Sequence, residues 1–248
     1  MKLSLVMITK NEEENIFKSL SAVKDLADEI IVVDSGSTDN TAKIAESLGA
    51  KVFKRQFDSF SNQKNYALSL ASNEWVLHID ADEIVPAALR DEIKQKLEDA
   101  QADAFYIPRE NYFLCKKMKY SGLAKEYRLR LAKKTKSEYV GGLIHEELVC
   151  EGKKEFLKNA FEHHSYPNLN KFFVKFDQYT TLGALKLFEK RKKFRISGIV
   201  LRPVFEFVKR YFLKLGFLDG IEGFVWAAIG MFYVFTKYIK LYELHKTK

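Results

Sequence analysis

Short apolar runs alternate with segments of helical periodicity over the first hundred residues of the chain. The runs have strand character and few polar interruptions, which predicts strands buried within a sheet. Strands that alternate with helices at this spacing indicate βαβ units and a mostly parallel sheet. The predicted strands cover residues 3–8, 29–34, 51–54 and 74–83.

Several helices in this region have end signals in the sequence. Asn11 is predicted to be an N-cap, because Glu14 follows it at the spacing of a capping box, and this helix is expected to reach about Val23. Gly49 is expected to end the helix after the second strand. Pro86 suits the first turn of the helix after the fourth strand.

Polar side chains follow three of the predicted strands: Thr9 and Asn11, then Asp34, then Asp80 and Asp82. The carboxyl ends of parallel strands share one edge of a sheet, where ligands bind. Asp80 and Asp82 would point to the same side if the strand stays extended that far. A divalent cation relieves the repulsion between two such carboxylates, and Mg²⁺ or Mn²⁺ prefers oxygen ligands. A solvated acidic turn is the alternative, but the convergence of three polar strand ends favours a site.

The pattern becomes more antiparallel after Ala104, with strands expected over residues 104–109, 112–120 and 128–134. Two polar clusters follow. One is a predicted loop over residues 141–147, in which His145, Glu146 and Glu147 follow two glycines, and the other is the segment 162–166, which contains His163. A surface loop or an internally satisfied polar residue is the alternative for each cluster.

The C-terminal part, residues 168–248, is expected to be a helical region separate from a catalytic domain over residues 1–167. The net charge of the chain is +8. Residues 186–214 hold ten Lys and Arg against two acids, which gives +8, so the remainder is neutral.

The apolar run 223–235 is shorter than the roughly 20 residues of a membrane span. Next to the basic cluster, it suits a helix in a membrane interface. A core or dimer-interface helix is the alternative, and nucleic-acid binding is not expected.

Two cysteines, Cys115 and Cys150, make neither a disulfide framework nor a metal-ligand spacing, which fits a reducing cytosol. The apolar run at residues 3–8 is too short for a signal peptide, so a cytoplasmic location is expected. The sequence has no G-x-G-x-x-G and no G-x-x-x-x-G-K-[ST], which counts against a dinucleotide-binding fold and a P-loop.

Three motifs in order, at residues 3–12, 29–39 and 80–83, resemble glycosyltransferase family 2. Later segments are similar to the bacterial branch that contains lipopolysaccharide core β-1,4-glucosyltransferases; these are residues 63–65, 130–131, 144–146 and 215–220. The resemblance implies a GT-A fold of the α/β class. Such a fold has a Rossmann-like, mostly parallel sheet with flanking helices and a small antiparallel region, here with a helical C-terminal extension.

The resemblance also implies a nucleotide-sugar donor and a role for each matching residue. Asp34 corresponds to the aspartate that accepts a hydrogen bond from the nucleotide base, and Thr9 and Asn11 line the same pocket. Lys64 and Arg130 are expected to add positive charge near the diphosphate.

The metal, Mg²⁺ or Mn²⁺, is expected on the acidic motif. Asp82 corresponds to its direct ligand and Asp80 to the residue near the ribose and the metal. His163 is expected to complete the coordination, with His145 as the alternative. The general base that deprotonates the acceptor is expected to be Glu146, with Glu147 as its rival.

The predicted function is therefore inverting, metal-dependent transfer of a sugar, glucose from UDP-glucose, to a lipopolysaccharide core or another glycolipid. The enzyme is expected to lie on the inner face of the cytoplasmic membrane through its C-terminal region. A protein-linked or polyprenyl-linked acceptor, or a non-catalytic membrane-surface adaptor with this fold, remains an alternative. A nucleotidyltransferase would need a phosphate-gripping loop near Thr9, which the sequence lacks.

Overall fold

The computed structural model describes residues 2–141, 146–166, 169–191 and 196–247. The chain forms two compact units, which are described separately. The first unit comprises Met1–Arg109 with Glu126–His163, and the second comprises Glu110–Lys125 with His164–Lys248.

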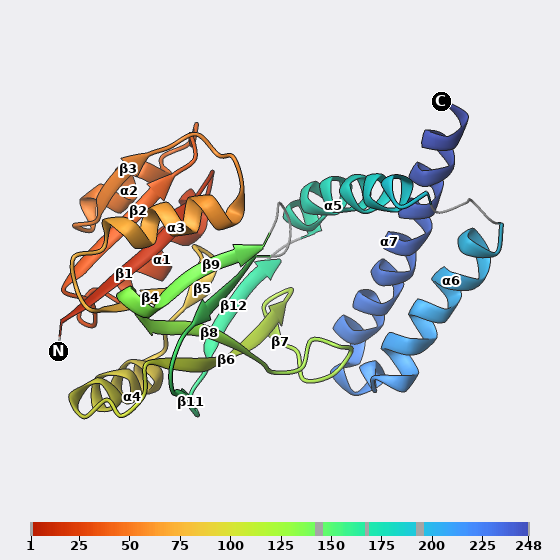
Figure 1. Cartoon of the computed structure of the whole chain (residues 1–248). Coiled ribbons are helices and arrows are strands. Elements are labelled where there is room, and N and C mark those ends of the chain that lie inside the picture. The colour runs from red at the N-terminus through yellow and green to blue at the C-terminus, as the bar shows by residue number, and fades with distance from the viewer. Residues whose placement is uncertain (1, 142–145, 167–168, 192–195, 248) are drawn as a thin grey trace. The chain divides into compact units, whose positions relative to one another are not determined.

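Half of the first unit is a parallel sheet in the strand order β3-β2-β1-β4, connected by helices (Figure 1). This confirms the α/β class. The four parallel strands overlap the predicted runs, but the fourth ends at His78 and not at residue 83. The strands are β1 (Leu3–Thr9), β2 (Glu29–Asp34), β3 (Lys51–Lys54) and β4 (Trp75–His78). The helices are α1 (Glu13–Ser21), α2 (Thr41–Ser47), α3 (Phe60–Leu70) and, after β4, α4 (Ala87–Glu98).

The sheet continues past β4 with strands in the order β8-β6-β12-β5, and β8 pairs antiparallel with both β4 and β6. A separate antiparallel hairpin joins β9 to β10. These strands are β5 (Glu83–Ile84), β6 (Ala104–Phe113), β8 (Glu126–Lys133), β9 (Ser137–Gly141), β10 (Glu146–Cys150) and β12 (Phe161–Tyr166). Two short strands, β7 (Lys116–Lys117) and β11 (Lys154–Phe156), pair with β6, and a 3₁₀ turn, η1 (Lys134–Lys136), precedes β9.

The prediction of separate strands over 104–109 and 112–120 was wrong. One strand, β6, runs from Ala104 to Phe113, because it pairs with β8 as far as Arg109 and with β7 at Tyr112 and Phe113. Leu114 and Cys115 then have positive φ angles of 48° and 64°, which turn the chain back into β7.

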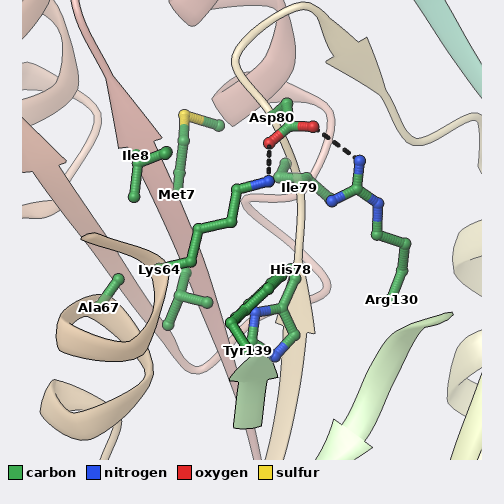
Figure 2. Close-up of a pocket in the computed structure, with 10 residues that line it drawn as sticks. Met7, Ile8, Lys64, Ala67, His78, Ile79, Asp80, Arg130 and Tyr139 are labelled. Atoms are coloured by element: carbon green, nitrogen blue, oxygen red, sulfur yellow. Dashed lines mark hydrogen bonds and ion pairs between the residues drawn. The ribbon is translucent and has the colours of Figure 1, made fainter. Parts of the chain in front are cut away.

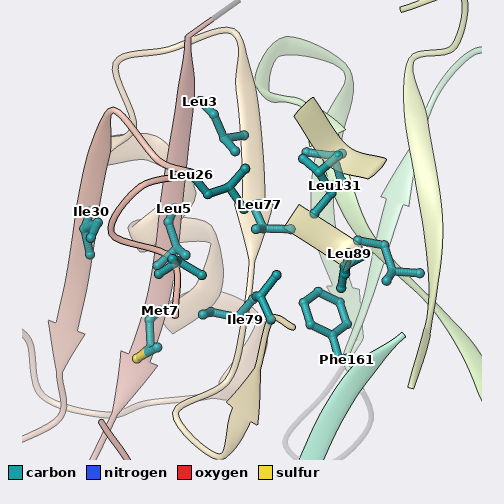
Figure 3. Close-up of a cluster of buried hydrophobic side chains, with 14 of the residues drawn as sticks. Leu3, Leu5, Met7, Leu26, Ile30, Leu77, Ile79, Leu89, Leu131 and Phe161 are labelled. Carbon is teal, nitrogen blue, oxygen red and sulfur yellow. The ribbon is translucent and has the colours of Figure 1, made fainter. Parts of the chain in front are cut away.

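Alternation along the parallel strands builds a core on each face of the sheet. Leu3, Leu5 and Met7 of β1 belong to the larger cluster (Figure 3), which also includes Leu89 of α4. Val6, between them, belongs to the other cluster, with the buried face of α3. Both faces of these strands are covered, which explains why their sequences are apolar runs rather than alternating patterns.

The predicted capping box at Asn11 was wrong. Helix α1 begins at Glu13, its N-cap is Glu12, and no side chain caps it. Asn11 instead has a φ of 54°, and its Oδ1 accepts a hydrogen bond from the Thr38 N–H at 2.8 Å. An Asn tolerates the left-handed conformation, and here the conformation directs its amide toward the loop after β2.

The second unit contains the segment 110–125, with the end of β6 and β7, and the helices α5 (Leu169–Glu189), α6 (Ile196–Val208) and α7 (Gly220–Lys246). A π-helical turn, η2 (Lys209–Leu213), and a 3₁₀ turn, η3 (Gly216–Asp219), connect α6 to α7, which lie side by side (Figure 1). An aromatic cluster that includes Phe113, Phe172 and Trp226 forms the core of this unit. The helical C-terminal extension predicted from the sequence is therefore confirmed.

Helix α7 is longer than the apolar run 223–235 suggested. The segment Gly216–Lys246 is the one helix of the described residues that is long and apolar enough to cross a membrane, judged by length and composition. The run 223–235 is thus the apolar middle of a longer helix, which begins at Gly220 and ends at Lys246. The predicted position of this helix in a membrane interface stays a prediction.

One carboxylate links three strands at the edge of the sheet opposite the polar strand ends. Glu29, at the start of β2, accepts hydrogen bonds from the Ser4 hydroxyl at 2.7 Å and the Ser72 N–H at 2.9 Å. Lys51 of β3 lies 2.8 Å from its other oxygen. Desolvation opposes ionisation, but these bonds lower the pKa of Glu29 to about 2.

We expect Glu29→Gln to lower the free energy of unfolding by about 2 kcal/mol at pH 7, because the folded state binds the ionised form more favourably. A carboxyl whose pKa is lowered by folding stabilises the protein above its unfolded pKa and loses this contribution as the pH falls. The difference between variant and wild type should therefore shrink from about pH 4.5 to about pH 2. Urea unfolding at several pH values checks this, and the exposed Glu46→Gln is the control. A difference that does not change with pH would contradict it.

Candidate functional site

The three polar strand ends lie on neighbouring strands, as the sequence predicts. Thr9 of β1 pairs with Asp34 of β2, and Val6 of β1 pairs with His78 of β4. Thr9 and Asp34 are buried, and the Thr9 hydroxyl has no hydrogen-bond partner among the described residues. The carboxyl edge of the parallel sheet thus carries a hydroxyl and a carboxylate side by side.

Asp34 holds the loop that follows β2. Its Oδ2 accepts the N–H groups of Gly36 and Ser37 at 3.1 and 2.9 Å, and its Oδ1 accepts the Ser37 hydroxyl. The Asn11 N–H donates to the same hydroxyl at 2.9 Å. Asn11 and Asp34 therefore fix one loop from two strand ends, an arrangement that the spacing of these residues in the sequence does not reveal.

The segment that contains Asp80 and Asp82 is a turn and not an extended strand. Strand β4 ends at His78, and the Glu83 N–H donates to the Asp80 carbonyl at 3.0 Å. The strand does not stay extended as far as Asp82, so strand geometry does not place the two carboxylates on one side. The two carboxylates have different partners instead.

Asp80 lies between two cations (Figure 2). Its Oδ1 is 3.2 Å from Lys64 Nζ, and its Oδ2 is 2.6 Å from an Arg130 nitrogen. Desolvation favours the neutral acid, but the charges of Arg130 and Lys64 hold the pKa of Asp80 well below its usual range. Burial likewise disfavours the cations, yet Asp80 raises the pKa of both Lys64 and Arg130. All three groups are therefore charged at neutral pH.

Arg130 also binds a second carboxylate, Glu83, which is fully buried. The distance from Arg130 to Glu83 Oε1 is 2.7 Å, and Glu83 Oε2 accepts the Asp80 N–H at 2.9 Å. Glu83 therefore fixes the backbone of the acidic turn through the N–H group of Asp80. No sequence pattern joins Glu83 to Arg130, because the two residues are 47 positions apart.

The same lysine reaches the predicted base. Lys64 Nζ is 3.0 Å from Glu146 Oε1, so one ammonium joins Asp80 to Glu146. Glu147 is exposed, because neighbouring residues of β10 point to opposite faces. The segment 142–145, which includes His145, lies outside the described residues.

Tyr139 and Asn65 are two residues of this site that the sequence did not single out for a role. The Tyr139 ring lies 5.3 Å from Lys64 Nζ and packs edge-on against His78, at 5.2 Å. Asn65 of α3 exchanges two hydrogen bonds with the Tyr139 backbone, at 2.8 and 2.7 Å. The position of Asn65 directly after Lys64 was the one signal in the sequence that could have indicated its role. Burial and the nearby cation Arg130 lower the pKa of His78 to about 3, so its imidazole is neutral.

Asp82 lies beside His163, with 3.5 Å between Asp82 Oδ2 and His163 Nε2. Strand β12 brings them together, because His163 pairs with Glu83 of β5. Among the described residues, no group of three or more His, Cys, Asp and Glu side chains is arranged to hold a metal ion. A carboxylate and an imidazole nonetheless fit a cation that takes its other ligands from phosphate and water, which is how Mg²⁺ is commonly held.

A sequence model described as glycosyl transferase family 2 matches residues 4–147, which is more than half of the chain. The chain belongs to this family, as its three motifs predict, and it is a glycosyltransferase. The GT-A fold expected from the resemblance is the architecture observed, with a parallel half followed by antiparallel strands.

Curated relatives extend the similarity over the whole chain. An uncharacterized glycosyltransferase of Rickettsia typhi is 32% identical over 255 residues, which cover 98% of this chain and 87% of the relative. The lipopolysaccharide core biosynthesis glycosyltransferase LpsC of Rhizobium meliloti is 28% identical over 256 residues, which cover 100% of this chain and 94% of LpsC. The predicted resemblance to the lipopolysaccharide core branch is therefore confirmed.

Solved structures give weaker matches. Glucosyl-3-phosphoglycerate synthase from Mycobacterium tuberculosis, in complex with Mn²⁺, UDP and glucosyl-3-phosphoglycerate, has a TM-score of 0.37 and 26% identity, over 45% of this chain and 44% of that one. TarS of S. aureus has a TM-score of 0.48 and 17% identity, over 75% of this chain and 40% of that one. Both scores are too low to carry information about the site of this chain.

We expect Arg130→Met to lower the free energy of unfolding by about 3 kcal/mol or more, because it leaves the buried Glu83 carboxylate without its nearest counter-charge. Arg128→Met is the matched control on the same strand. Arg128 is half exposed and forms a surface ion pair with Glu126, so its loss should cost less than about 1 kcal/mol. Urea unfolding of the two variants measures both values, and equal effects would contradict the assignment.

Proposed function

We propose that this glycosyltransferase is an inverting, metal-dependent enzyme that uses a nucleotide-sugar donor. The observation that carries the proposal is the position of Lys64, whose ammonium lies 3.2 Å from Asp80 and 3.0 Å from Glu146. Asp80 follows the fourth parallel strand, where donors bind in folds of this type, and Glu146 lies on the β9–β10 hairpin. A single cation therefore lies between the donor side and the acceptor side of the site.

The loop fixed by Asp34 and Asn11 is the proposed nucleotide pocket. Thr9 supports this assignment, because its buried hydroxyl lies at the strand end next to Asp34 and has no hydrogen-bond partner in the described part of the chain. A ligand polar group would remove the cost of that unpaired hydroxyl. Asp34 serves here as the proposed acceptor for the nucleotide base and as the residue that fixes the loop.

Lys64 and Arg130 are proposed to attract the diphosphate. Their charges are partly balanced by Asp80 and the carboxylates around it, which keeps the two cations ordered before the donor arrives. Ordered charges of this kind lose little free energy through reorganisation when a second charge develops nearby.

Asp82 and His163 are the residues that would hold Mg²⁺ or Mn²⁺, with Asp80 close by on the same turn. When bound, such a cation would neutralise the charge that develops on the departing nucleoside diphosphate. Residues of this chain would position the diphosphate and acceptor around it.

Glu146 is the proposed general base. It accepts the proton of the acceptor hydroxyl while that oxygen forms a bond to the anomeric carbon, and the bond from this carbon to the diphosphate oxygen breaks on the opposite side. The single displacement inverts the anomeric configuration. Glu147 is a weaker candidate, because its side chain is exposed while Glu146 faces Lys64.

The proposed transfer is of glucose from UDP-glucose to a lipopolysaccharide core or another glycolipid, at the inner face of the cytoplasmic membrane. The relative LpsC, which is named for lipopolysaccharide core biosynthesis and matches the whole chain, supports this acceptor class. The apolar segment Gly216–Lys246 and the basic residues before it support a membrane contact of the C-terminal region.

A screen of nucleotide sugars tests the donor and the metal together. We expect metal-dependent release of UDP from UDP-glucose, and we expect Asp82→Asn to reduce it by about 100-fold or more, since loss of even an indirect partner of a metal ligand costs up to this much. Asp91→Asn on the exposed side of α4 is the control. Failure of every donor to turn over would favour a non-catalytic adaptor, and a fully active Asp82→Asn variant would remove Asp82 from the metal site.

We expect Glu146→Gln to lower the rate constant for transfer by about 10²-fold or more while donor affinity changes little, because the amide keeps the shape but cannot accept the proton. Glu147→Gln is the control and should retain its rate. Pre-steady-state transfer to an acceptor and equilibrium titration of the donor separate the two quantities. An equal loss in both variants would place the base elsewhere.

A further inference from the structure

Helix α6 has its apolar side chains on the outside. Five of them repeat at helical spacing along one side and are between 54% and 75% exposed. These residues, named here the outer face of α6, are Ile196, Val200, Leu201, Val204 and Phe205. Single exposed apolar residues are common on proteins, but a continuous row of this kind marks a surface that another apolar phase covers.

A partly buried ion pair lies next to α7. Glu206 of α6 and Arg210 of the turn η2 are 2.8 Å apart and have only 18% and 24% of their side chains exposed. The Arg210 guanidinium lies over the Trp226 ring, at 5.1 Å. It also lies so close to Gly230 that a Cβ there would be 2.6 Å from Arg210 Nε. Helix α6 therefore differs from a helix that faces water, because Glu206 lies on its inner side and five apolar side chains lie on its outer side.

Three more apolar side chains, in the turns between α6 and α7 and at the start of α7, are exposed. Leu213, Leu218 and Ile221 are 67%, 54% and 72% exposed. The corner between α6 and α7 is rigid, because the buried Asp219 carboxylate accepts the N–H groups of Lys119 and Tyr120 at 3.0 and 2.9 Å. These exposed side chains are therefore held in place by internal hydrogen bonds.

Charge distinguishes between the apolar partners that could cover this surface. The whole net charge of +8 lies within residues 186–214, which include α6 and both its flanks. A second copy of the chain would bring an equal positive segment against the first, which opposes association. An anionic lipid surface would attract it, and each nearby Lys or Arg adds to that attraction.

We infer that the outer face of α6, together with Leu213, Leu218 and Ile221 at the corner, inserts into one leaflet of a membrane that contains anionic lipid. Basic side chains at both ends of α6 then meet the headgroups, while the Glu206–Arg210 pair stays inside the helical unit. This inference deepens the membrane contact of the proposed function and rests on it, but it does not depend on the identity of the donor or the base.

Vesicle co-sedimentation of the full chain tests the inference. Wild-type protein should bind phosphatidylcholine vesicles that contain phosphatidylglycerol and should bind pure phosphatidylcholine weakly. The double variant Leu201→Gln with Phe205→Gln should have an affinity for these vesicles at least about tenfold lower, because the variant no longer transfers two apolar side chains from water into lipid. The matched control is Phe17→Gln with Phe156→Gln, which changes two side chains of similar exposure in the other unit and should bind as wild type.

Two further measurements keep the result interpretable. Circular dichroism and metal-dependent UDP release should be unchanged in the α6 variant. Asp82→Asn should bind vesicles as wild type does. The two assays therefore distinguish a failure of the transferase assignment from a failure of the membrane assignment. In a second readout, acyl-chain-brominated lipid should quench a tryptophan introduced by Phe205→Trp but not one introduced by Phe17→Trp. Equal vesicle binding of the α6 variant and the control would overturn the inference. A second result would also overturn it: wild-type protein that does not bind vesicles but forms a dimer, when the α6 variant is a monomer.

Discussion

The ion pair between Arg130 and the buried Glu83 is the interaction on which the arrangement of the site depends. Glu83 has no exposed surface, so its charge would be very costly without the guanidinium 2.7 Å away. The same carboxylate accepts the Asp80 N–H, and the same guanidinium binds the Asp80 carboxylate. The turn after β4 is therefore fixed both through its backbone and through its side chain, before any ligand is considered.

Lys64 extends this network from the sheet to the β9–β10 hairpin. Asn65, next to it on α3, binds the Tyr139 backbone of β9, so one turn of helix positions both the ammonium and the hairpin that carries Glu146. Burying such a network costs free energy of desolvation, and the ion pairs offset this cost only when every charged group has its partner. The position of the base and the position of the donor-side carboxylate are thus coupled through one lysine.

The second unit differs from the first, because it encloses the Glu206–Arg210 ion pair and exposes apolar side chains of α6. In water this arrangement would be unfavourable by both measures, whereas against lipid it is the stable one. Gly230 permits it, because only a residue without a side chain leaves room for the Arg210 guanidinium against α7. The catalytic chemistry proposed for the first unit and the surface of the second can therefore be tested with separate variants.

Local sequence determined the strands, the parallel order and the family. Strands that are buried on both faces and are each followed by a helix can form only a few sheet topologies. The same pattern places the motifs at residues 3–12, 29–39 and 80–83 at the ends of strands. Local signals failed where a distant group competed with them. Asn11 has the spacing of an N-cap, but its amide binds Thr38 instead. The Asp80–Asp82 segment resembles a strand end, but Glu83 and Arg130 pull it into a turn.

What only the tertiary structure decided is which charges meet. Lys64 and Glu146 are 82 residues apart, and Arg130 and Glu83 are 47 residues apart. No periodicity joins them, because such pairs form only when the sheet and the hairpin have folded around them. In the same way, the sequence marked residues 186–235 as basic and apolar, but the packing of α6 against α7 decided that the Glu206–Arg210 pair lies inside and that five apolar side chains of α6 lie outside. Composition specifies how much of each kind of side chain exists, and tertiary packing specifies which of them remains at the surface.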